Sequence, residues 1–428
     1  MRLRVTSSSD NVRGEMTKIR NLCVFIFLAV AAFAQDKPTS LQSLIAEARQ
    51  NNTAILAADR AIQTTTYRPK QASALPDTEF MVQSFTVGSP RPFAGYSNSD
   101  FAYIGFGASQ EIPYPGKRAL RGGVAQHETA ISSAEKNGAV WDVLTRLKLA
   151  YFQLAASQLI TSLLVKNQQF ADQIEQAAEA RYRVGQGTQQ DVLRAQLERT
   201  RLLNELSMQH RENAQAQAVL KALLNRPPDS PDILAEPLSA RHAPSAETLF
   251  AKLRQSNPEL QVSAELVSQG HASVDLAKRE KKPDFGVQYM WQHTASNFRD
   301  YYMGTFSIRL PNRSRVRAAE GESQAKLAQA EAEKESRSKQ MESDLGEQLA
   351  VVQFSGQQLK VYDEGLLPQS EAALDAGLAG YRAGKQEYQS LLASFAVTLQ
   401  LSMDRARVLA EHEAAMAQIE GLIGEELQ

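Results

Sequence analysis

The sequence predicts a mainly α-helical protein with a small β part, in which one structural plan is used twice. Three observations support this fold class: two very long helical stretches, four short strand-like segments, and a series of landmarks that recurs along the chain. The chain has 428 residues, of which 43% are hydrophobic and 22% charged, as is typical of a folded protein. Its formal net charge of −1 indicates no basic surface, so nucleic-acid partners are not expected.

The N-terminus has the three parts of a secretory signal. Lys18 and Arg20 precede an apolar run over 22–32, and the small-residue sequence A-F-A follows at 32–34, as signal peptidase requires. The run is too short to cross a bilayer as a helix. A buried core helix is the alternative interpretation of the same run.

We interpret residues 1–34 as a signal peptide and predict cleavage before Gln35, with Met16 as the start of translation and residues 1–15 as an upstream extension. Cleavage would remove Cys23, the only cysteine. The mature chain would then hold no thiol for a disulfide or a metal site, which suits an oxidising compartment. The sequence therefore predicts an exported protein.

The mature chain follows one plan twice, over 35–225 and 245–428, with a proline-rich linker at 226–244 between the copies. The opening helices match at a constant offset: Leu44, Ala46, Arg49, Gln50 and Asn52 in the first copy, and Leu249, Ala251, Arg254, Gln255 and Asn257 in the second. Each copy then has a Pro-Asp pair before its first strand, at 76–77 and 283–284. Landmarks in the same order indicate an internal duplication.

Strand-like segments follow each Pro-Asp pair, in hairpins expected at about 78–112 and 284–311. In three segments apolar residues alternate with small or polar ones: Ala102, Ile104, Phe106 and Ala108; Phe285, Val287, Tyr289 and Trp291; Tyr302, Phe306, Ile308 and Leu310. The segment near 79–87 alternates poorly. Such runs suit tilted strands with one face in lipid and one in water, although a hairpin packed on a soluble core would show the same pattern.

Four strands are too few to close a barrel, because about eight is the smallest number that does so. An open sheet in lipid would leave unpaired backbone groups at both edges, which the bilayer does not tolerate. Several chains must therefore share one barrel. We predict four membrane β-strands per chain, and three chains would supply twelve.

Two helical stretches are long enough to extend far from such a barrel. The first, over 116–183, contains no proline and would be roughly 100 Å long. The second, over 314–382, contains Pro368, which should kink it. Shorter helices are expected at 54–75, 188–225, 258–281 and 387–425. Because one compact domain cannot hold such helices, we predict duplicated long-helix hairpins that form an α-barrel tunnel from several chains.

The helix after residue 188 has a heptad seam. Steps of three and four residues pass through mostly apolar positions: Val192, Ala195, Arg199, Leu202, Leu206, Gln209, Asn213, Ala216, Leu220 and Leu223. This spacing predicts coiled-coil packing along that helix.

Two segments resemble the periplasmic turns of TolC-like outer-membrane efflux proteins, the outer-membrane factors of tripartite efflux pumps. They are A-R-Y-R-V-G-Q-G-T-Q-Q-D-V-L-R-A-Q over 180–196 and Y-R-A-G-K over 381–385. The resemblance extends over about 40–425 and includes the duplication. It implies a passive duct that exports small molecules or metal ions.

The resemblance also implies how the duct is built. A homotrimer would form a 12-stranded β-barrel in the lipid of the outer membrane, continuous with a twelve-helix tunnel in the periplasm. The end of the tunnel would dock a periplasmic adaptor, a membrane fusion protein that belongs to an inner-membrane efflux pump. The pump would supply the energy.

The segment Q-E-I-P-Y-P-G-K-R over 110–118 resembles the corner between strand and helix in family members paired with heavy-metal pumps, the CusC-like branch. Its prolines and glycine mark the turn from barrel to tunnel. We expect its basic pair, Lys117 and Arg118, to face lipid headgroups or solvent.

The first turn has a local physical explanation. Gly185 and Gly187 are expected to supply the positive φ angles that reverse the chain between two helices. Thr188 should cap the next helix, with Asp191 completing the capping arrangement at its positive end. A plain helix–helix turn would account for these residues. The resemblance implies in addition that the residues of both turns meet the adaptor: Val184, Gly185, Gly187, Thr188, Ala383, Gly384 and Lys385.

A gate near these turns is also implied by the resemblance. In the best-known family member, an aspartate after the first turn is joined to a tyrosine and an arginine at the second. Asp191 and Tyr381 occupy the aspartate and tyrosine positions, whereas Gln386 stands in place of the arginine. Two aspartates that form rings at the pore constriction fall on Ser390 and Ala393, so an acidic ring is not expected there.

The sequence contains no motif for catalysis or cofactor binding. Its six histidines are dispersed, and phosphate-loop, nucleophile-elbow and zincin motifs are missing. We therefore expect neither an enzyme nor a bound metal or cofactor. The alternative function is a periplasmic helical adaptor or scaffold without channel activity. It would explain the signal and the heptads but would need a compact β-domain.

Overall fold

The computed structural model describes residues 38–88, 90–93, 101–294 and 299–427. The expected signal peptide and its cleavage site lie outside these residues. The first copy contains α2 (Leu41–Asn51), α3 (Thr53–Thr66), α4 (Arg68–Ala72), β1 (Glu79–Phe85), β2 (Tyr103–Ile112), α5 (Lys117–Arg183) and α6 (Gln189–Leu223). The second contains α7 (Ala246–Ser256), α8 (Pro258–Arg279), β3 (Asp284–His293), β4 (Tyr301–Arg309), α9 (Arg313–Val361), a π-helical turn (Tyr362–Leu366), α10 (Leu367–Arg382) and α11 (Tyr388–Ile423).

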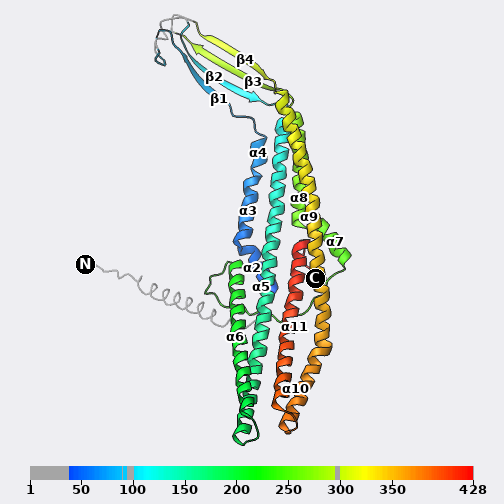
Figure 1. Ribbon diagram of the computed structural model, residues 1–428. Helices are drawn as coiled ribbons and strands as arrows, with labels where there is room; N and C mark the ends of the chain where they lie inside the picture. The colour runs from blue at the N-terminus through cyan, green and yellow to red at the C-terminus, as the bar shows by residue number, and fades with distance from the viewer. Residues whose placement is uncertain (1–37, 89, 94–100, 295–298, 428) are drawn as a thin grey trace, which may run out of the picture.

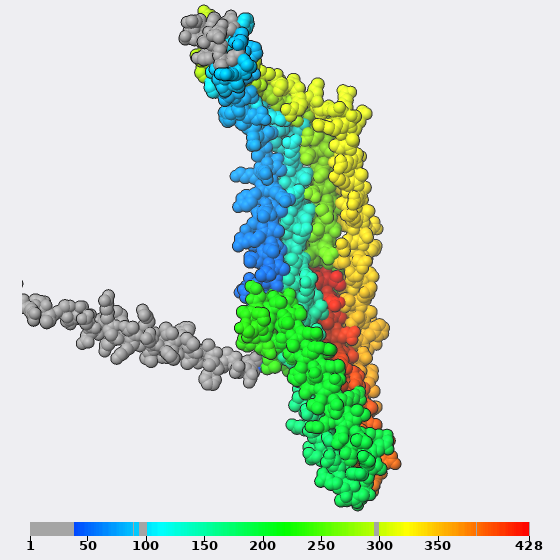
Figure 2. Space-filling view, turned by 60° about the vertical axis from the view of Figure 1, so that its left-hand side comes forward, coloured from blue at the N-terminus to red at the C-terminus, as the bar shows by residue number. Residues whose placement is uncertain are grey.

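The molecule is a long layer of helices with a small sheet at one end (Figure 1), so the predicted mainly α fold class with a small β part is confirmed. α5 has 67 residues and is about 100 Å long. Near the sheet, the helices lie in the order α3–α4, α5, α8, α9, which Figure 2 shows as blue, cyan, green and yellow strips. Toward the other end, α5 lies between α6 and α11, and α11 contacts α9 and α10. Within the described ranges, no helix combines the length and the apolar character needed to cross a membrane.

The four predicted strands form one antiparallel sheet in the order β1-β2-β3-β4. β2 and β3 join the two copies, with Ile112 opposite Phe285 and Ile104 opposite His293. β1 and β4 are therefore the edges of the sheet within the described residues (Figure 1).

The register sorts the strand side chains onto two different faces. One face carries exposed apolar and aromatic residues: Phe80, Val82, Phe106, Val287, Tyr289, Trp291, Phe306 and Ile308. The other carries mainly small and polar residues: Gln83, Gly105, Ser109, Glu111, Gln288, Thr305, Ser307 and Arg309. Phe106 stacks on Trp291 and Phe285 on Phe306, with ring centroids 5.9 Å apart in each pair. The weakly alternating strand β1 follows this division only in part, because Met81 and Phe85 lie on the polar face and Ser84 lies on the apolar face.

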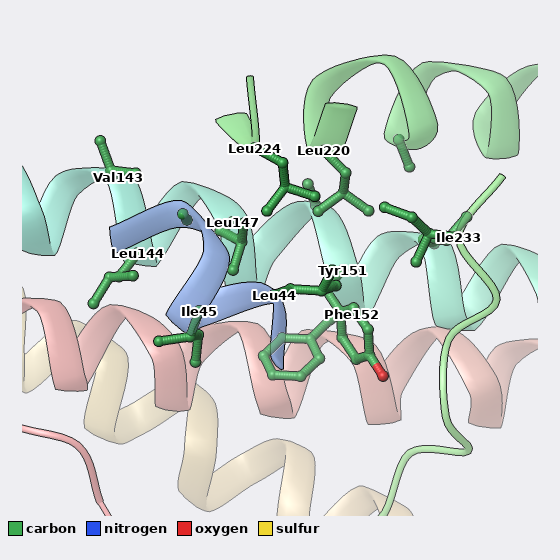
Figure 3. Close-up of a cluster of buried hydrophobic side chains, with 14 of the residues drawn as sticks. Leu44, Ile45, Val143, Leu144, Leu147, Tyr151, Phe152, Leu220, Leu224 and Ile233 are labelled. Atoms are coloured by element: carbon green, nitrogen blue, oxygen red, sulfur yellow. The ribbon is translucent and has the colours of Figure 1, made fainter. Parts of the chain in front are cut away.

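A hydrophobic core lies where α2, α5, α6 and the linker meet (Figure 3). Leu44 of α2, Leu147 of α5 and Leu220 of α6 are fully buried there, and Ile233 of the linker covers them. The heptad seam of α6 is confirmed, because four of its positions are buried at steps of seven residues: Ala195, Leu202, Gln209 and Ala216.

Two buried lysines tie the copies together. Lys148 on α5 pairs with Glu420 on α11, with Nζ 2.6 Å from Oε2, and Arg241 of the linker reaches the other carboxylate oxygen at 2.8 Å. Lys117 lies at the corner between β2 and α5, where its Nζ is 2.9 Å from Asp284 Oδ1. Each buried charge is compensated by a carboxylate of the second copy.

The prediction that Lys117 and Arg118 face lipid headgroups or solvent is wrong for Lys117, whereas Arg118 is half-buried. Lys117 is 1% exposed, because Asp284 and Glu280 surround its ammonium group. Arg118 donates from Nε to the backbone oxygen of Ser73 at 2.7 Å. The corner is therefore locked to the second copy by contacts between residues far apart in sequence.

The interruption expected at Pro368 is a π-helical turn just before the proline. Leu367 N donates to the backbone oxygen of Tyr362, one residue farther back than in an α-helix. A turn of this kind accommodates one extra residue without ending the helix. The proline itself lies in the first turn of α10, where its missing N–H is tolerated.

Candidate functional site

The two turns singled out from the sequence lie together at the end of the layer opposite the sheet (Figures 1 and 2). We call 184–188, between α5 and α6, the first tip, and 383–387, between α10 and α11, the second tip. Residues of both tips line one hollow of about 450 Å³. The packing of α5 and α6 against α10 and α11 thus creates a site that neither hairpin forms alone.

The two tips share one backbone conformation. Gly185 N donates to Tyr182 O, and Gly384 N donates to Tyr381 O, each at 3.0 Å. The φ angles of Gly185 and Gly384 are 75° and 69°, in the left-handed region that favours glycine. The positive φ predicted for Gly185 is confirmed, and Gly384 is its counterpart.

The prediction of a positive φ at Gly187 is wrong, since its backbone does not lie in that region. One left-handed residue is sufficient to end α5. Gly187 is needed for a different reason: a Cβ there would lie 3.2 Å from Tyr182 N and 3.3 Å from Arg181 Cβ. A side chain at this position would therefore press against the end of the helix that the chain has just left, whose atoms would have to shift by a few tenths of an ångström.

The predicted cap of α6 is confirmed. Asp191 N donates to Thr188 Oγ1 at 3.2 Å, and Thr188 N donates to Asp191 Oδ2 at 3.1 Å. This reciprocal pair is a capping box. The second tip has no such device, because Glu387 stands at the N-cap of α11 without a side-chain hydrogen bond.

The residues expected to meet the adaptor are accessible. Gly187 is half-buried, and the others are exposed: Val184, Gly185, Thr188, Ala383, Gly384 and Lys385. Val184 is an apolar side chain at the extreme end of the layer and is 67% exposed. Contact with an adaptor stays a prediction for all seven.

Three of the four gate candidates line the hollow, but they do not all interact. Asp191, Tyr381 and Gln386 line it. Gln386 Nε2 donates to Ser390 Oγ at 2.8 Å. Asp191 instead is engaged by Thr188 of its own tip. Gln386, which stands where the resemblance would place an arginine, therefore contacts Ser390 of its own hairpin.

Two residues at the hollow were missed by the sequence interpretation. Arg181 lies over the ring of Tyr381, with Cζ 5.1 Å from the ring centroid, and this cation–π contact joins the two hairpins. Tyr388 meets Tyr381 edge-on, with ring centroids 5.9 Å apart and planes at 64°. Both contacts depend on how the hairpins pack, which periodicity does not specify.

The Tyr388 hydroxyl is buried among these groups and has no hydrogen-bond partner among the described residues. Burial raises the pKa of Tyr388, and the neighbouring Tyr381 and Asp191 raise it further. The hydroxyl therefore stays neutral at physiological pH. Across the described ranges, no group of three or more His, Cys, Asp or Glu is placed to hold a metal ion.

No family model matches the sequence, and no curated protein matches it. Solved structures, however, are similar over almost the whole chain. The outer-membrane channel OprN has a TM-score of 0.76 at 15% identity, covering 90% of this chain and 89% of its own. The outer membrane protein VceC from Vibrio cholerae has a TM-score of 0.75 at 17% identity, covering 91% and 97%. CusC, described for its transmembrane channel formation, has a TM-score of 0.76 at 13% identity, covering 92% and 96%. The chain therefore has the fold of these outer-membrane channels, the TolC-like fold that its sequence predicted.

Proposed function

We propose that the chain is one subunit of a trimeric outer-membrane channel that acts as a passive efflux duct. The observation that carries this proposal is the sheet, whose apolar face is exposed and whose edge strands are unpaired within the described residues. A soluble protein rarely leaves such a face uncovered. The description of OprN, CmeC and MtrE as outer-membrane channels supports the proposal.

Lipid is the environment that suits the apolar face. Phe80, Phe306 and Ile308 are 84%, 64% and 55% exposed, and removing one such side chain from water stabilises a protein by about 1.5–3 kcal/mol. The polar face would line a water-filled pore, as in other membrane barrels. Three copies of the sheet would supply twelve strands and leave no open edge.

The helical layer would continue this pore into the periplasm. Three copies, each four helices wide, would close a tunnel whose far end consists of the tips. Their exposed small residues support docking of a periplasmic adaptor, which would connect the duct to an inner-membrane pump. The pump supplies the energy for export of small molecules or metal ions, so the duct needs no chemistry of its own.

The test is native mass spectrometry of the detergent-extracted protein, followed by conductance measurements in planar bilayers. We expect a trimer that is recovered from outer membranes and that conducts ions. A water-soluble monomer without conductance would overturn the proposal and favour the periplasmic scaffold.

Two adjacent positions on opposite faces of β3 provide a matched pair of variants. Tyr289→Arg places a charge on the apolar face, which costs about 2–4 kcal/mol at the bilayer midplane, so the yield of membrane-inserted trimer should fall. Gln288→Arg places the same charge on the polar face, so trimers should still insert and show changed ion selectivity. Equal insertion of both variants would mean that the apolar face does not contact lipid.

A further inference from the structure

The two hairpins of the sheet have the same strand register. The Pro-Asp pairs at 76–77 and 283–284 align the first strands, β1 with β3, and Pro113 and Pro311 align the second strands, β2 with β4. In this alignment the pair Glu79–Ser109 corresponds to Gly286–Ser307. Both are opposite pairs in the structure. The hairpins are therefore equivalent residue by residue.

This equivalence makes the centre of the sheet a template for its edges. At the centre, β2 of the first hairpin pairs with β3 of the second, with Ile112 opposite Phe285 and Ser109 opposite Gln288. The unpaired edges are β4 and β1 (Figure 1). By the alignment, β4 corresponds to β2 and β1 corresponds to β3. The edge of β4 can therefore pair with the edge of β1 in the way that β2 pairs with β3.

We propose, on the basis of the trimeric channel above, that β4 of one subunit pairs antiparallel with β1 of the next subunit. The register of this pair is that of the internal β2–β3 pair. Ser307 then lies opposite Met81 of the partner subunit, and Ile308 lies opposite Phe80 of the partner subunit. Arg309 lies opposite Glu79 of the partner subunit. The partner is a second copy of this chain.

The side chains agree with this register. It places Ile308 and Phe306 beside Phe80 and Val82 of the partner subunit, so that exposed apolar residues meet on one face. On the other face it places Arg309 beside the carboxylate of Glu79 of the partner subunit. Arg309 pairs with Glu111 of its own chain at 2.7 Å but remains 71% exposed, so a second carboxylate can approach it. A slip of one residue would place the apolar face of one subunit beside the polar face of the next. A slip of two residues would keep the faces but separate the charges.

The alignment extends into the helices. Four buried residues of α9 correspond at one constant offset to four buried residues of α5: Met341, Leu345, Val352 and Ser355 to Val143, Leu147, Leu154 and Ser157. Beyond the π-helical turn, the sequence offset between corresponding residues of the two repeats is larger by one residue. At this larger offset Tyr381 corresponds to Tyr182. The extra residue of that turn accounts for the change.

At the offset of these buried helix residues Arg315 corresponds to Lys117, and at the different offset of the Pro-Asp pairs Asp77 corresponds to Asp284. Lys117 and Asp284 form the buried ion pair of the internal corner. Arg315 and Asp77 are both exposed, and in one subunit they lie close in sequence to opposite edge strands, β4 and β1. The closed ring would bring Arg315 to Asp77 of the partner subunit, repeating the corner contact with charges of the same signs. The second contact of Lys117, with Glu280, would have no equivalent there, because Ser73 occupies the matching position.

Disulfide trapping tests the register. Cys23 is replaced by Ser, and cysteine pairs are introduced in one chain: Ser307→Cys with Met81→Cys, and Ile308→Cys with Phe80→Cys. Adjacent pairs of an antiparallel ladder alternate in geometry, so one of them has the closer Cβ approach. Within one subunit, these positions are three strand spacings apart, about 14 Å, and cannot be bridged by a disulfide. We expect at least one pair to give a covalent trimer on a non-reducing denaturing gel.

Two control pairs fix the register. Ser307→Cys with Val82→Cys reports a slip of one residue, and Ser307→Cys with Gln83→Cys reports a slip of two residues. A conducting trimer that is trapped only by a control pair, or by none, would overturn the proposed register and leave the channel proposal intact. Failure to form any trimer by native mass spectrometry would instead overturn the channel proposal.

A charge exchange tests the corner pair. Arg315→Asp alone and Asp77→Arg alone should each lower the thermal stability of the trimer, because each places like charges together. The double variant should recover most of the loss. A double variant no more stable than the single ones would exclude the ion pair between subunits.

Discussion

Gln386 lies against Gly380 at the second tip: a Cβ on Gly380 would be 2.8 Å from Gln386 Oε1 and 3.2 Å from Gln386 Cβ. The equivalent residues of the first tip are Gly187 and Arg181, where a Cβ on Gly187 would be 3.3 Å from Arg181 Cβ. In each tip a glycine thus lies against a long side chain. The long side chain comes first in the sequence at the first tip, and the glycine comes first at the second tip. The long side chain comes from α5 in the first tip and from the turn itself in the second.

This relationship predicts that Gly380→Ala displaces Gln386 and breaks its hydrogen bond to Ser390. Overpacking of this kind costs about 1–3 kcal/mol. In a Gln386→Ala background only the 3.2 Å contact with Cβ remains, so the same substitution should cost less and be offset by up to about 1 kcal/mol through helix propensity. Hydrogen exchange of the amides at the second tip would measure both effects. Additive substitutions would show that the two residues do not constrain each other.

The two N-caps make a second comparison possible. Thr188→Ala removes the side-chain half of the capping box and should destabilise the start of α6 by about 0.5–2 kcal/mol. Glu387→Ala occupies the equivalent place at α11, where no side-chain hydrogen bond exists, and should change little. The readout is hydrogen exchange in the first turn of each helix. Equal responses of the two tips would contradict the assignment of the capping box.

These comparisons indicate what the sequence could predict. The cap by Thr188 and the left-handed Gly185 are local features, and the strand faces follow from alternation, so all three could be predicted from neighbouring residues. The burial of Lys117 could not, because its compensating carboxylate, Asp284, comes from the other copy. The contact of Arg181 with Tyr381 was missed for the same reason. Long-range packing decided each of these outcomes.

The buried hydroxyl of Tyr388 predicts a stability change with pH. An unpaired buried hydroxyl costs about 1–3 kcal/mol, so Tyr388→Phe should be at least as stable as the wild type at neutral pH. Because burial raises the pKa of Tyr388 in the folded protein, the unfolded chain releases its proton first, from about pH 10 upward. The folded state then binds more protons than the unfolded state, so wild-type stability falls as pH rises.

The Tyr388→Phe variant should lack the part of the stability loss at high pH that comes from ionisation of Tyr388. Denaturant titrations of both proteins between pH 7 and pH 11 would measure the difference, with Tyr182→Phe, at a 48% exposed position, as the control at neutral pH. Parallel curves for wild type and Tyr388→Phe would contradict the buried environment of this hydroxyl.

The ion pair of Lys148 and Glu420 predicts a strong dependence of stability on one lysine. Lys148→Met leaves the 1% exposed carboxylate of Glu420 with Arg241 as its remaining cation, and breaking a buried pair costs about 3–5 kcal/mol. Lys136→Met is the matched control, because Lys136 also lies on α5 and pairs with Asp59 at 2.7 Å, but both side chains of this pair are partly exposed. Its loss should be much smaller, since solvent screens such a pair. Thermal unfolding of the two variants would separate them, and similar losses would contradict the special role of the buried pair.

If the tips close the duct, the contact of Arg181 should affect the ratio of open to closed channels. Its contact with Tyr381 joins the two hairpins of one subunit, and a cation–π contact at a partly exposed site is worth about 0.5–1 kcal/mol. Arg181→Gln should therefore shift the ratio of open to closed tips by about two- to five-fold per subunit, seen as a larger open fraction in single-channel records. Arg183→Gln is the control, because Arg183 is exposed and pairs only along its own helix with Glu179. If both variants gate like the wild type, the closed state is held by contacts between subunits rather than by the contact between hairpins.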